Sequence, residues 1–350
     1  MPSNSEYLAP PDRFDRTPYR RAGRSGLLLP EISLGFWLNF GDTTAFQIQR
    51  DIVRRAYDLG ITHFDLANNY GPPSGAAEEN FGRIFQKDLK PYRDDIIVST
   101  KAGGVSRSGP YGDWGSRKYM LSSLDASLKR LNLDYVDIFY HHRPDPNTPL
   151  EETMGALAAA VHSGKALYAA ISNYSPARTR QAAEILATMN VPLVLNQPSY
   201  NMLNRHIESP QQKDNIDGQQ YESLIDVDGE LGIGTIVYSP LAQGLLTNKY
   251  LDGNMPKDSR AANKDKIWLS KDNITEEYLT KARALNEIAE NRNQTLAQLA
   301  ISWNLRDPRI TSAIVGASSI KQLEDTHKAL TAPPLTPAEL EKIEEILAVG

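Results

Sequence analysis

The chain of 350 residues contains no cysteine. Disulfide bonds, thiolate zinc sites, iron–sulfur clusters and cysteine nucleophiles are therefore excluded together. The six histidines are scattered along the sequence, and no two of them form a His-x-x-x-His pair. A metal-dependent barrel hydrolase would need clusters of histidine and carboxylate ligands, so we expect no metal site.

An excess of positive charge is also missing, because the net charge is -5 and the basic residues are interleaved with acidic ones. This excludes the clustered basic surface of a nucleic-acid-binding protein. No run approaches the ~18 apolar residues that a membrane span requires. Residues 1–19 lack the apolar segment of a signal peptide. We therefore expect no nucleic-acid partner, no membrane and a cytoplasmic location.

Short apolar runs recur along the chain, and each is followed by a segment with helical periodicity. The runs are nearly continuous rather than alternating, which is typical of parallel strands buried on both faces. The eight predicted strands are residues 32–37, 62–67, 96–101, 136–142, 166–172, 193–198, 234–240 and 310–317.

The segments between the runs carry helix signals. Residues 48–59 and 117–131 place apolar side chains at helical spacing. Helix starts are indicated by Ser or Thr before Pro, twice with Glu three residues after the Thr, and helix ends by Gly. The predicted starts are Thr148, Ser175 and Thr336, and the predicted ends are Gly60 and Gly164.

Eight strands alternating with helices fit a closed barrel or a large open sheet. An open sheet of the dinucleotide-binding type would carry a glycine-rich motif after its first strand, and none is present there. Gly232-Ile233-Gly234 is half of such a motif, but it precedes a strand. The sequence therefore predicts the α/β class, as a (β/α)8 TIM barrel.

Some segments are longer than a minimal barrel requires, and they indicate how the chain is divided. Residues 1–30 are predicted to form an N-terminal arm and a barrel-floor hairpin, and residues 31–350 a single barrel. Long loops at 103–118, 201–230 and 241–275 follow predicted strands. They therefore lie at the C-terminal face, where barrel enzymes build their sites.

Polar residues gather where the apolar strands end. Asp65 ends the second strand with Tyr70 just beyond it, Lys101 ends the third, and His142 ends the fourth. A buried polar group must be paired, and a single Lys or His at such a place is more often a structural partner. The ordered set is much more specific than any one of its members.

That ordered set resembles the catalytic tetrad of the aldo-keto reductases. The segments FDLANNYG, STKAG, HHRPD, NQPSYN, YSPLAQGLL and GASSIKQLED resemble the same family, from about residue 35 to about residue 330. HRPD and SPLAQGLL look closest to two of its branches, the bacterial L-glyceraldehyde 3-phosphate reductases and the β-subunits of voltage-gated potassium channels. The resemblance implies an NADPH-dependent enzyme that reduces a small aldehyde or ketone, with phosphorylated ones included.

The resemblance also implies a role for each tetrad residue. Tyr70 is expected to donate a proton to the carbonyl oxygen. Because tyrosine has an ordinary pKa of ~10, Lys101 is expected to lower it, with Asp65 anchoring Lys101. His142 is expected to hydrogen-bond the carbonyl oxygen. Its neighbour His141 would point to the opposite face of the strand.

For the cofactor, the resemblance implies contacts to the nicotinamide, the pyrophosphate and the adenosine. Arg260 and Lys321 are candidates for the 2′-phosphate that distinguishes NADP from NAD, or else they are solvated surface charges. The expected cofactor residues are Trp37, Asp65, Ser172, Asn173, Gln197, Tyr238, Ser239, Pro240, Leu241, Gln243, Gly244, Lys249, Arg260, Gly316, Ser318, Gln322 and Asp325.

The substrate is expected to meet Trp37, Tyr70, Trp114 and Arg143. Two of the expected positions depart from the common family pattern. Asp325-Thr326 stands where many relatives have Glu-Asn, which puts the adenine contacts in doubt. Arg143 stands where many have Trp, and it either binds an anionic substrate or braces the barrel rim.

A second function remains open, that of a nucleotide-sensing regulatory subunit related to the channel β-subunits. Those proteins carry Asn where this chain has His142, so the complete tetrad favours the enzyme. For either function we expect a homo-oligomer, a tetramer or an octamer.

Overall fold

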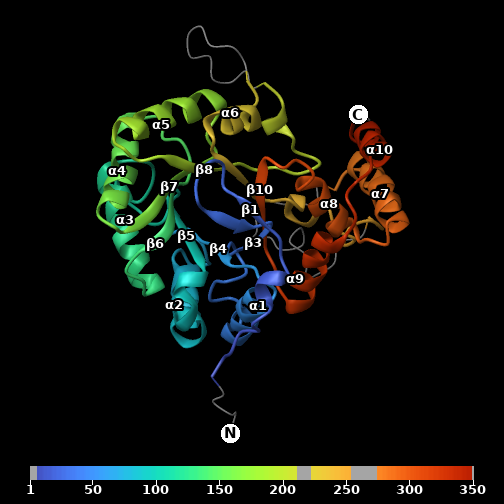
Figure 1. The fold of residues 1–350 in the computed structure, drawn as a ribbon, viewed down its shortest axis with the longest axis horizontal. Helices are drawn as coiled ribbons and strands as arrows, with labels where there is room; N and C mark the ends of the chain where they lie inside the picture. Colours follow the sequence, from blue (N-terminus) through green and yellow to red (C-terminus); the bar gives the residue numbers. More distant parts are fainter. Residues whose placement is uncertain (1–5, 211–221, 254–273, 349–350) are drawn as a thin grey trace.

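The computed structural model describes residues 6–210, 222–253 and 274–348. Eight parallel strands close into a barrel in the order β10-β3-β4-β5-β6-β7-β8-β9 (Figure 1). Each overlaps one predicted run, so the predicted barrel is confirmed. The strands are β3 (Ile32–Gly35), β4 (His63–Asp65), β5 (Ile97–Ala102), β6 (Val136–His141), β7 (Ala166–Ser172), β8 (Leu193–Gln197), β9 (Gly234–Val237) and β10 (Ile310–Val315).

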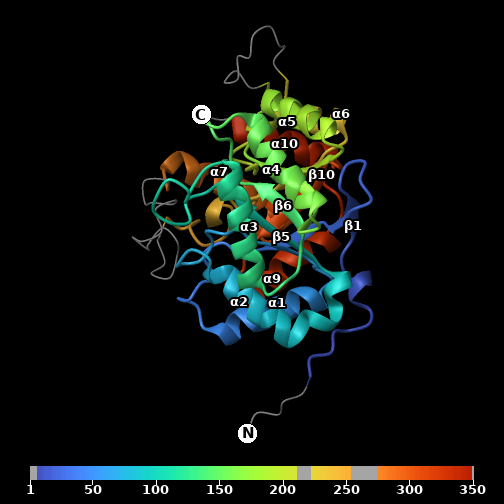
Figure 2. The same cartoon turned by 90° about the vertical axis from the view of Figure 1, so that its left-hand side faces the viewer.

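Helices surround the strands, as Figures 1 and 2 show. Neighbouring helices such as α3 and α4 pack side by side outside the barrel, and their apolar faces cover its outer surface. The helices are α1 (Phe46–Asp58), α2 (Ala76–Ile84), α3 (Arg117–Leu131), α4 (Leu150–His162), α5 (Pro176–Thr188), α6 (Leu224–Leu231), α7 (Glu276–Asn291), α8 (Leu296–Asn304), α9 (Ile320–His327) and α10 (Pro337–Ala348).

Two of the three predicted helix starts are confirmed. The Ser175 side chain accepts from the Arg178 backbone and begins α5, and Thr336 and Glu339 exchange hydrogen bonds at the start of α10. The prediction for Thr148 is wrong, because α4 begins after Pro149 with no side-chain cap. Asp145 Oδ1 accepts from the Thr148 backbone instead, so a local turn of the chain takes the place of the cap.

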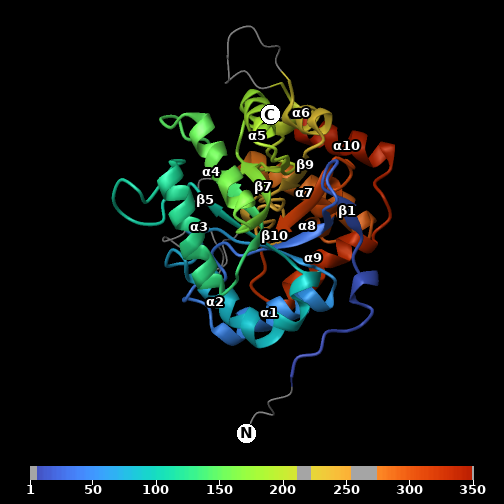
Figure 3. The ribbon, with the colours of Figure 1, turned by 60° about the vertical axis from the view of Figure 1, so that its left-hand side comes forward.

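A hairpin of β1 (Tyr19–Arg21) and β2 (Leu28–Pro30) lies at the amino ends of the barrel strands (Figure 3). Arg20 donates to the carbonyl of Ile310, the first residue of β10. Leu27 and Leu29 join a buried cluster with apolar residues from the barrel interior. The hairpin therefore covers this end of the barrel.

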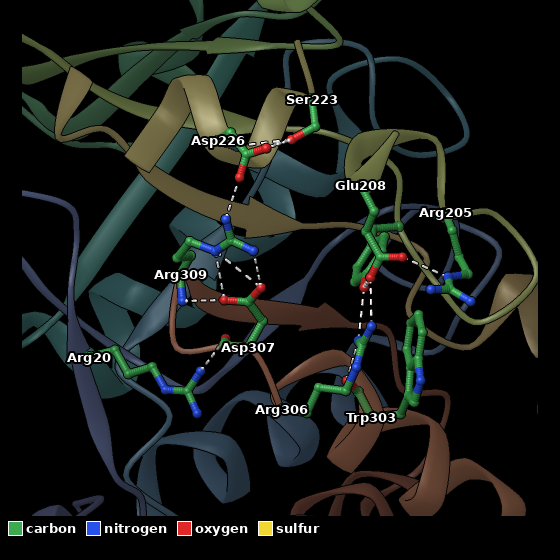
Figure 4. Close-up of polar contacts among 10 residues, drawn as sticks. Arg20, Arg205, Glu208, Ser223, Asp226, Trp303, Arg306, Asp307 and Arg309 are labelled. Atoms are coloured by element: carbon green, nitrogen blue, oxygen red, sulfur yellow. Dashed lines mark hydrogen bonds and ion pairs between the residues drawn. The ribbon is translucent and has the colours of Figure 1, made fainter. Parts of the chain in front are cut away.

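A group of ion pairs lies near the start of β10 (Figure 4). Arg309 binds Asp307 at 2.6 Å and Asp226 of α6 at 2.6 Å. Arg306 binds Glu208, and its guanidinium lies 3.7 Å from the centre of the Trp303 ring system. Such pairs near the surface contribute little stability singly, but this network ties the hairpin, α6 and the start of β10 together.

Within the described ranges, every helix is too short or too polar to span a bilayer.

Candidate active site

The four residues of the expected tetrad lie together at the carboxyl ends of β4, β5 and β6. Lys101 is completely buried, and its Nζ donates to Asp65 Oδ2 at 2.5 Å and to the Leu66 carbonyl at 2.9 Å. The same Nζ lies 5.2 Å from the centre of the Tyr70 ring. The rings of Tyr70 and His142 meet edge to face at 5.9 Å.

Burial and charge oppose each other at the Asp65–Lys101 pair. Burial acts to raise the pKa of Asp65, but Lys101 and then His63 outweigh it, and the pKa is lowered. Burial lowers the pKa of Lys101, while the charge of Asp65 acts in the opposite direction. A buried pair of this kind is costly unless its remaining polar atoms are hydrogen-bonded, and Ser99 donates to Asp65 Oδ1 at 2.8 Å.

The pKa of Tyr70 departs from the sequence prediction. Burial, followed by the charge of Asp65, raises the pKa of Tyr70 well above its ordinary value, whereas the sequence suggests that Lys101 lowers it. The reason is that burial disfavours the charged phenolate, and the negative charge of Asp65 adds to this effect. Tyr70 is therefore a fully protonated donor at neutral pH.

The two adjacent histidines separate as predicted. His142 lies beside Tyr70, whereas His141 is buried on the opposite side of the strand and its Nδ1 pairs with the Tyr174 hydroxyl at 2.7 Å. Burial, and then the charge of Lys101, lowers the pKa of His142 to about 3. His142 is thus a neutral imidazole, and its buried Nδ1 has no hydrogen-bond partner in the described part of the chain.

The residues expected around the nicotinamide adjoin the tetrad. Gln197 Nε2 donates to Asp65 Oδ1 at 3.1 Å, and Ser172 Oγ donates to the Gln197 carbonyl at 2.7 Å. Asn173 Nδ2 donates to the His142 carbonyl at 3.0 Å, and Asn173 Oδ1 accepts from the Tyr238 hydroxyl at 2.7 Å. One hydrogen-bonded set therefore joins the ends of β7, β8 and β9 to the tetrad.

The loop after β9 holds the residues expected near the pyrophosphate. Leu241 is right-handed (φ -97°, ψ 17°) and is followed by left-handed Ala242 (φ 45°) and Gln243 (φ 61°). The backbone N–H groups of Ala242 and Gly244 donate within the turn, to the carbonyls of Ser239 and Leu241 at 2.9 and 2.8 Å. Pro240 and Gly244 lie in the same turn, with the Pro240 carbonyl bound by Asn304, and Lys249 lies exposed beyond it.

The residues expected near the adenosine lie after β10. Gly316 and Ser318 are exposed, and Gln322 Oε1 accepts from the Ser318 backbone at 2.9 Å and from its hydroxyl at 2.8 Å. Asp325 is bound by Thr295 and Gln298 of the α8 start, so its carboxylate already has partners within the fold. Arg260 lies outside the described residues.

Arg143 and Trp114 form a clamp at the rim beside His142. The Arg143 guanidinium lies 4.0 Å from the centre of the Trp114 ring system and binds both oxygens of Asp113 at 2.8 and 2.6 Å. Its Nε donates to the Gly103 carbonyl at 3.0 Å. These contacts support the interpretation that Arg143 braces the barrel rim. Trp114 remains 37% exposed. Trp37, after β3, is half-buried.

Three polar residues inside the barrel were not predicted as part of the site. Tyr140, Ser99 and His63 are completely buried. His63 and Ser99 lie two residues before Asp65 and Lys101 on their strands, and Tyr140 lies two residues before His142, which directly follows β6. Side chains two apart on a strand share a face. That spacing was the signal available in the sequence.

The described residues include no group of three or more His, Asp or Glu placed to hold a metal ion.

Residues 31–348 match a family model with the description "Aldo/keto reductase family". The chain belongs to the aldo/keto reductase family. It is therefore an oxidoreductase that acts on carbonyl groups, and members of this family use nicotinamide cofactors.

Two kinds of relatives match nearly the whole chain. L-glyceraldehyde 3-phosphate reductase of Escherichia coli K12 is 52% identical over 98% of this chain and 96% of its own length. A probable voltage-gated potassium channel subunit beta of Oryza sativa is 36% identical over 94% of this chain and 96% of its own length. A putative subunit of the same kind in Schizosaccharomyces pombe is 36% identical over 94% and 93%.

Proposed function

We propose that this reductase uses NADPH to reduce small phosphorylated aldehydes such as L-glyceraldehyde 3-phosphate, with Tyr70 as the general acid. The observation that carries the proposal is the buried Lys101, which binds Asp65 at 2.5 Å and lies against the Tyr70 ring. A protein rarely buries a lysine so completely unless its charge serves a purpose.

The reduction needs a proton at the same oxygen where negative charge develops. The bound nicotinamide supplies the hydride. His142, which is neutral, donates a hydrogen bond that orients the carbonyl oxygen. Tyr70 then donates its proton; its raised pKa does not prevent this, because the developing alkoxide is a stronger base than a phenolate. Lys101 stabilises the phenolate that remains.

The residues after β7, β8, β9 and β10 fit a dinucleotide. Ser172, Asn173 and Gln197 offer amide and hydroxyl groups to the carboxamide, and Tyr238 offers a ring face to the nicotinamide. Ser239, Leu241, Gln243 and Gly244 would line the pyrophosphate, as the family resemblance implies. Gly316, Ser318 and Gln322 would hold the adenosine.

The preference for NADPH over NADH is part of the proposal. Lys321 is exposed at the start of α9 and is available to a 2′-phosphate. Arg260, the other candidate from the sequence, lies outside the described residues. We expect Lys321→Ala to raise the KM for NADPH several-fold while the KM for NADH changes little. Equal changes for the two cofactors would show that Lys321 does not select between them.

The substrate proposal follows the reductase that is 52% identical. Arg143, Trp114 and Asp113 contact one another beside His142, and we expect the substrate to meet Arg143 and Trp114 there. L-glyceraldehyde 3-phosphate and unphosphorylated L-glyceraldehyde share the reacting group, so the ratio of their kcat/KM values measures what the phosphate contributes. A ratio near one would show that the enzyme does not recognise the phosphate, although it would still be a reductase of small aldehydes.

The direct test compares the wild type with Tyr70→Phe and His142→Ala. We expect Tyr70→Phe to lose about 10²–10⁴-fold in kcat, because it removes the proton donor and leaves the ring and its packing in place. Its affinity for NADPH, measured by fluorescence titration, should stay within twofold of the wild type, roughly the scatter of such measurements. Tyr70→Phe as active as the wild type would contradict the mechanism.

A second function, that of a nucleotide-sensing regulatory subunit, follows from the resemblance to potassium channel β-subunits, one of which is 36% identical. That function predicts tight NADPH binding with negligible turnover on a broad panel of aldehydes. We also propose a homo-oligomer and a cytoplasmic location. Analytical ultracentrifugation and cell fractionation test these two proposals independently of activity.

A further inference from the structure

A continuous row of buried hydrogen bonds crosses one sector of the barrel interior and ends at the Asp65–Lys101 pair. Ser312 Oγ and Ser33 Oγ are 2.7 Å apart, and Ser33 Oγ lies 2.8 Å from His63 Nδ1. His63 Nε2 lies 3.0 Å from Ser99 Oγ. The row spans four adjacent strands, β10, β3, β4 and β5, and all four residues are completely buried.

The direction of every proton in the row follows from its end at Asp65. An ionised carboxylate only accepts, so Ser99 donates to Asp65 Oδ1 at 2.8 Å. Ser99 must then accept from His63 Nε2–H. His63 is neutral because burial lowers its pKa to about 4, so its other nitrogen accepts from Ser33. Ser33 in turn accepts from Ser312.

Each donor therefore points toward Asp65. Hydrogen bonds aligned in one direction polarise one another and strengthen the last of them. The rest of the barrel interior is mostly apolar, for example at Ile138, Ala170, Leu195 and Ile236. Burying hydroxyl and imidazole groups costs free energy that apolar side chains would not, and this sector is the one directly below the catalytic pair.

We propose that His63 is a positioning residue, which acts through Ser99 to hold Asp65 in the orientation that keeps Lys101 beside Tyr70. The inference rests on the proposed roles of Asp65, Lys101 and Tyr70. His63 touches none of the reacting atoms. Gln197 also donates to Asp65 Oδ1, at 3.1 Å, so loss of the row weakens the anchoring of Asp65 without abolishing it.

Three identical substitutions test the row. Ser99→Ala, Ser33→Ala and Ser312→Ala each remove one hydroxyl from a completely buried position. Because Ser99 donates to a charged group, Ser99→Ala should lower kcat about tenfold, whereas Ser33→Ala and Ser312→Ala should lower it less than about threefold, in that order. The KM for NADPH should not change. Equal losses for all three, or losses in KM alone, would overturn the proposal.

Substitutions of His63 separate positioning from packing. His63→Gln keeps an amide donor for Ser99, whereas His63→Leu fills space and donates nothing. We expect His63→Gln to retain several-fold more kcat than His63→Leu. His327→Leu is the matched control, because His327 is also buried and pairs through Nε2 with a hydroxyl, that of Thr17, away from the site. Equal kcat in the Gln and Leu variants would overturn the proposal.

The pH profile gives an independent readout. Removing a hydrogen bond to an ionised carboxylate raises its pKa, so the acid limb of kcat should move to higher pH in Ser99→Ala. The ionisable groups facing Asp65 are His63 on its own strand, Lys101 on β5, Tyr140 on β6, His142 directly after β6, and Tyr70 beyond β4. These groups are unchanged in Ser99→Ala. If the acid limb of kcat stays at the same pH in this variant, the hydrogen-bonded row does not act on Asp65.

Failure of this inference can be told apart from failure of the proposed function. If Tyr70→Phe is inactive and the serine series shows no order, the tetrad holds and the row is only structural. If Tyr70→Phe is active, the function itself is wrong and the order of the serine series loses its meaning.

Discussion

The loops at the two ends of the barrel differ in which residues adopt the left-handed backbone conformation. Loops that lead from a helix to the next barrel strand use glycine or asparagine there, and in the described part of the chain no other type. Loops that follow strands also use larger side chains. The first set is Gly60, Asn132, Gly164, Asn190 and Gly232; the second includes Leu38, Trp114, Ser239, Ala242 and Gln243.

The difference has an energetic meaning. Glycine has no Cβ, and asparagine tolerates this conformation, so the first set costs little. A larger side chain in the left-handed region costs on the order of 1–3 kcal/mol, which persists only where the surroundings hold it. The strain therefore gathers at the face that carries the candidate site, while the other end of the barrel follows the rules of stable turns.

The largest expected effect is at the carboxylate–lysine pair of the site. Lys101→Met leaves Asp65 buried and unpaired, so we expect a loss of about 3–5 kcal/mol in unfolding free energy together with the loss of activity. The double variant Asp65→Asn/Lys101→Met should regain most of the stability and none of the activity. Urea unfolding and NADPH oxidation measure the two. A Lys101→Met variant as stable as the wild type would show that the pair is not strongly coupled.

At the other end, substitution of a helix-ending glycine should reduce stability alone. A Cβ at Gly60 (φ +84°) would lie 2.4 Å from the Arg13 carbonyl oxygen, so Gly60→Ala should destabilise the fold by about 2 kcal/mol. Its kcat, measured well below the unfolding temperature, should match the wild type. Ala242→Gly is the counterpart: it relieves left-handed strain of about 1–3 kcal/mol and loses about 0.4–1 kcal/mol through the freer unfolded chain. Stability should therefore rise, while NADPH binding should weaken because the loop is less firmly held. The comparison fails if Gly60→Ala lowers kcat and Ala242→Gly leaves binding intact.

A smaller effect is expected at the rim clamp. Asp113→Asn removes the carboxylate that neutralises Arg143, so the KM for a phosphorylated aldehyde should fall about threefold, as suits an exposed charge in high dielectric. The KM for the unphosphorylated aldehyde should stay the same. Asp125→Asn breaks the exposed pair with Lys165 and serves as the control. A fall for both aldehydes in Asp113→Asn would point to a change of loop shape instead of charge.

The smallest expected effect concerns the pH profile of kcat/KM, in which we expect no change from the titration of His142. Because burial lowers the pKa of His142 to about 3, the imidazole stays neutral throughout the range where an ordinary histidine titrates, between about pH 5 and 8. The ratio of kcat/KM values for the wild type and His142→Gln should be flat across that range. A step in this ratio near the ordinary histidine pKa would mean that His142 is charged in the working enzyme.

Much of the fold was predictable because its signals are local. Continuous apolar runs marked each barrel strand, and Gly60 and Gly164 marked helix ends through the conformation that glycine allows. The helix start predicted at Thr148 was wrong because Asp145, three residues earlier, accepts a hydrogen bond from the Thr148 backbone. Asp145, which lies outside the capping motif, thus determines where the helix begins.

The candidate site was predictable only in part. The order of Asp65, Tyr70, Lys101 and His142 along the chain indicated where these residues meet. The pairing of Arg143 with Asp113 joins positions thirty residues apart, and nothing in either residue's neighbourhood specifies it. The left-handed conformations of Leu38 and Gln243 were equally hidden, since neither residue prefers that region and the surrounding loop imposes it.

The most direct test of the central claim is a single-turnover experiment with NADPH pre-bound and an aldehyde added in excess. The absorbance of NADPH reports the chemical step free of cofactor exchange. We predict a fast loss of absorbance in the wild type, and a loss at least about 10²-fold slower in Tyr70→Phe at equal NADPH occupancy. Equal rates in the two proteins would contradict the assignment of Tyr70 as the proton donor and, with it, the account of the site.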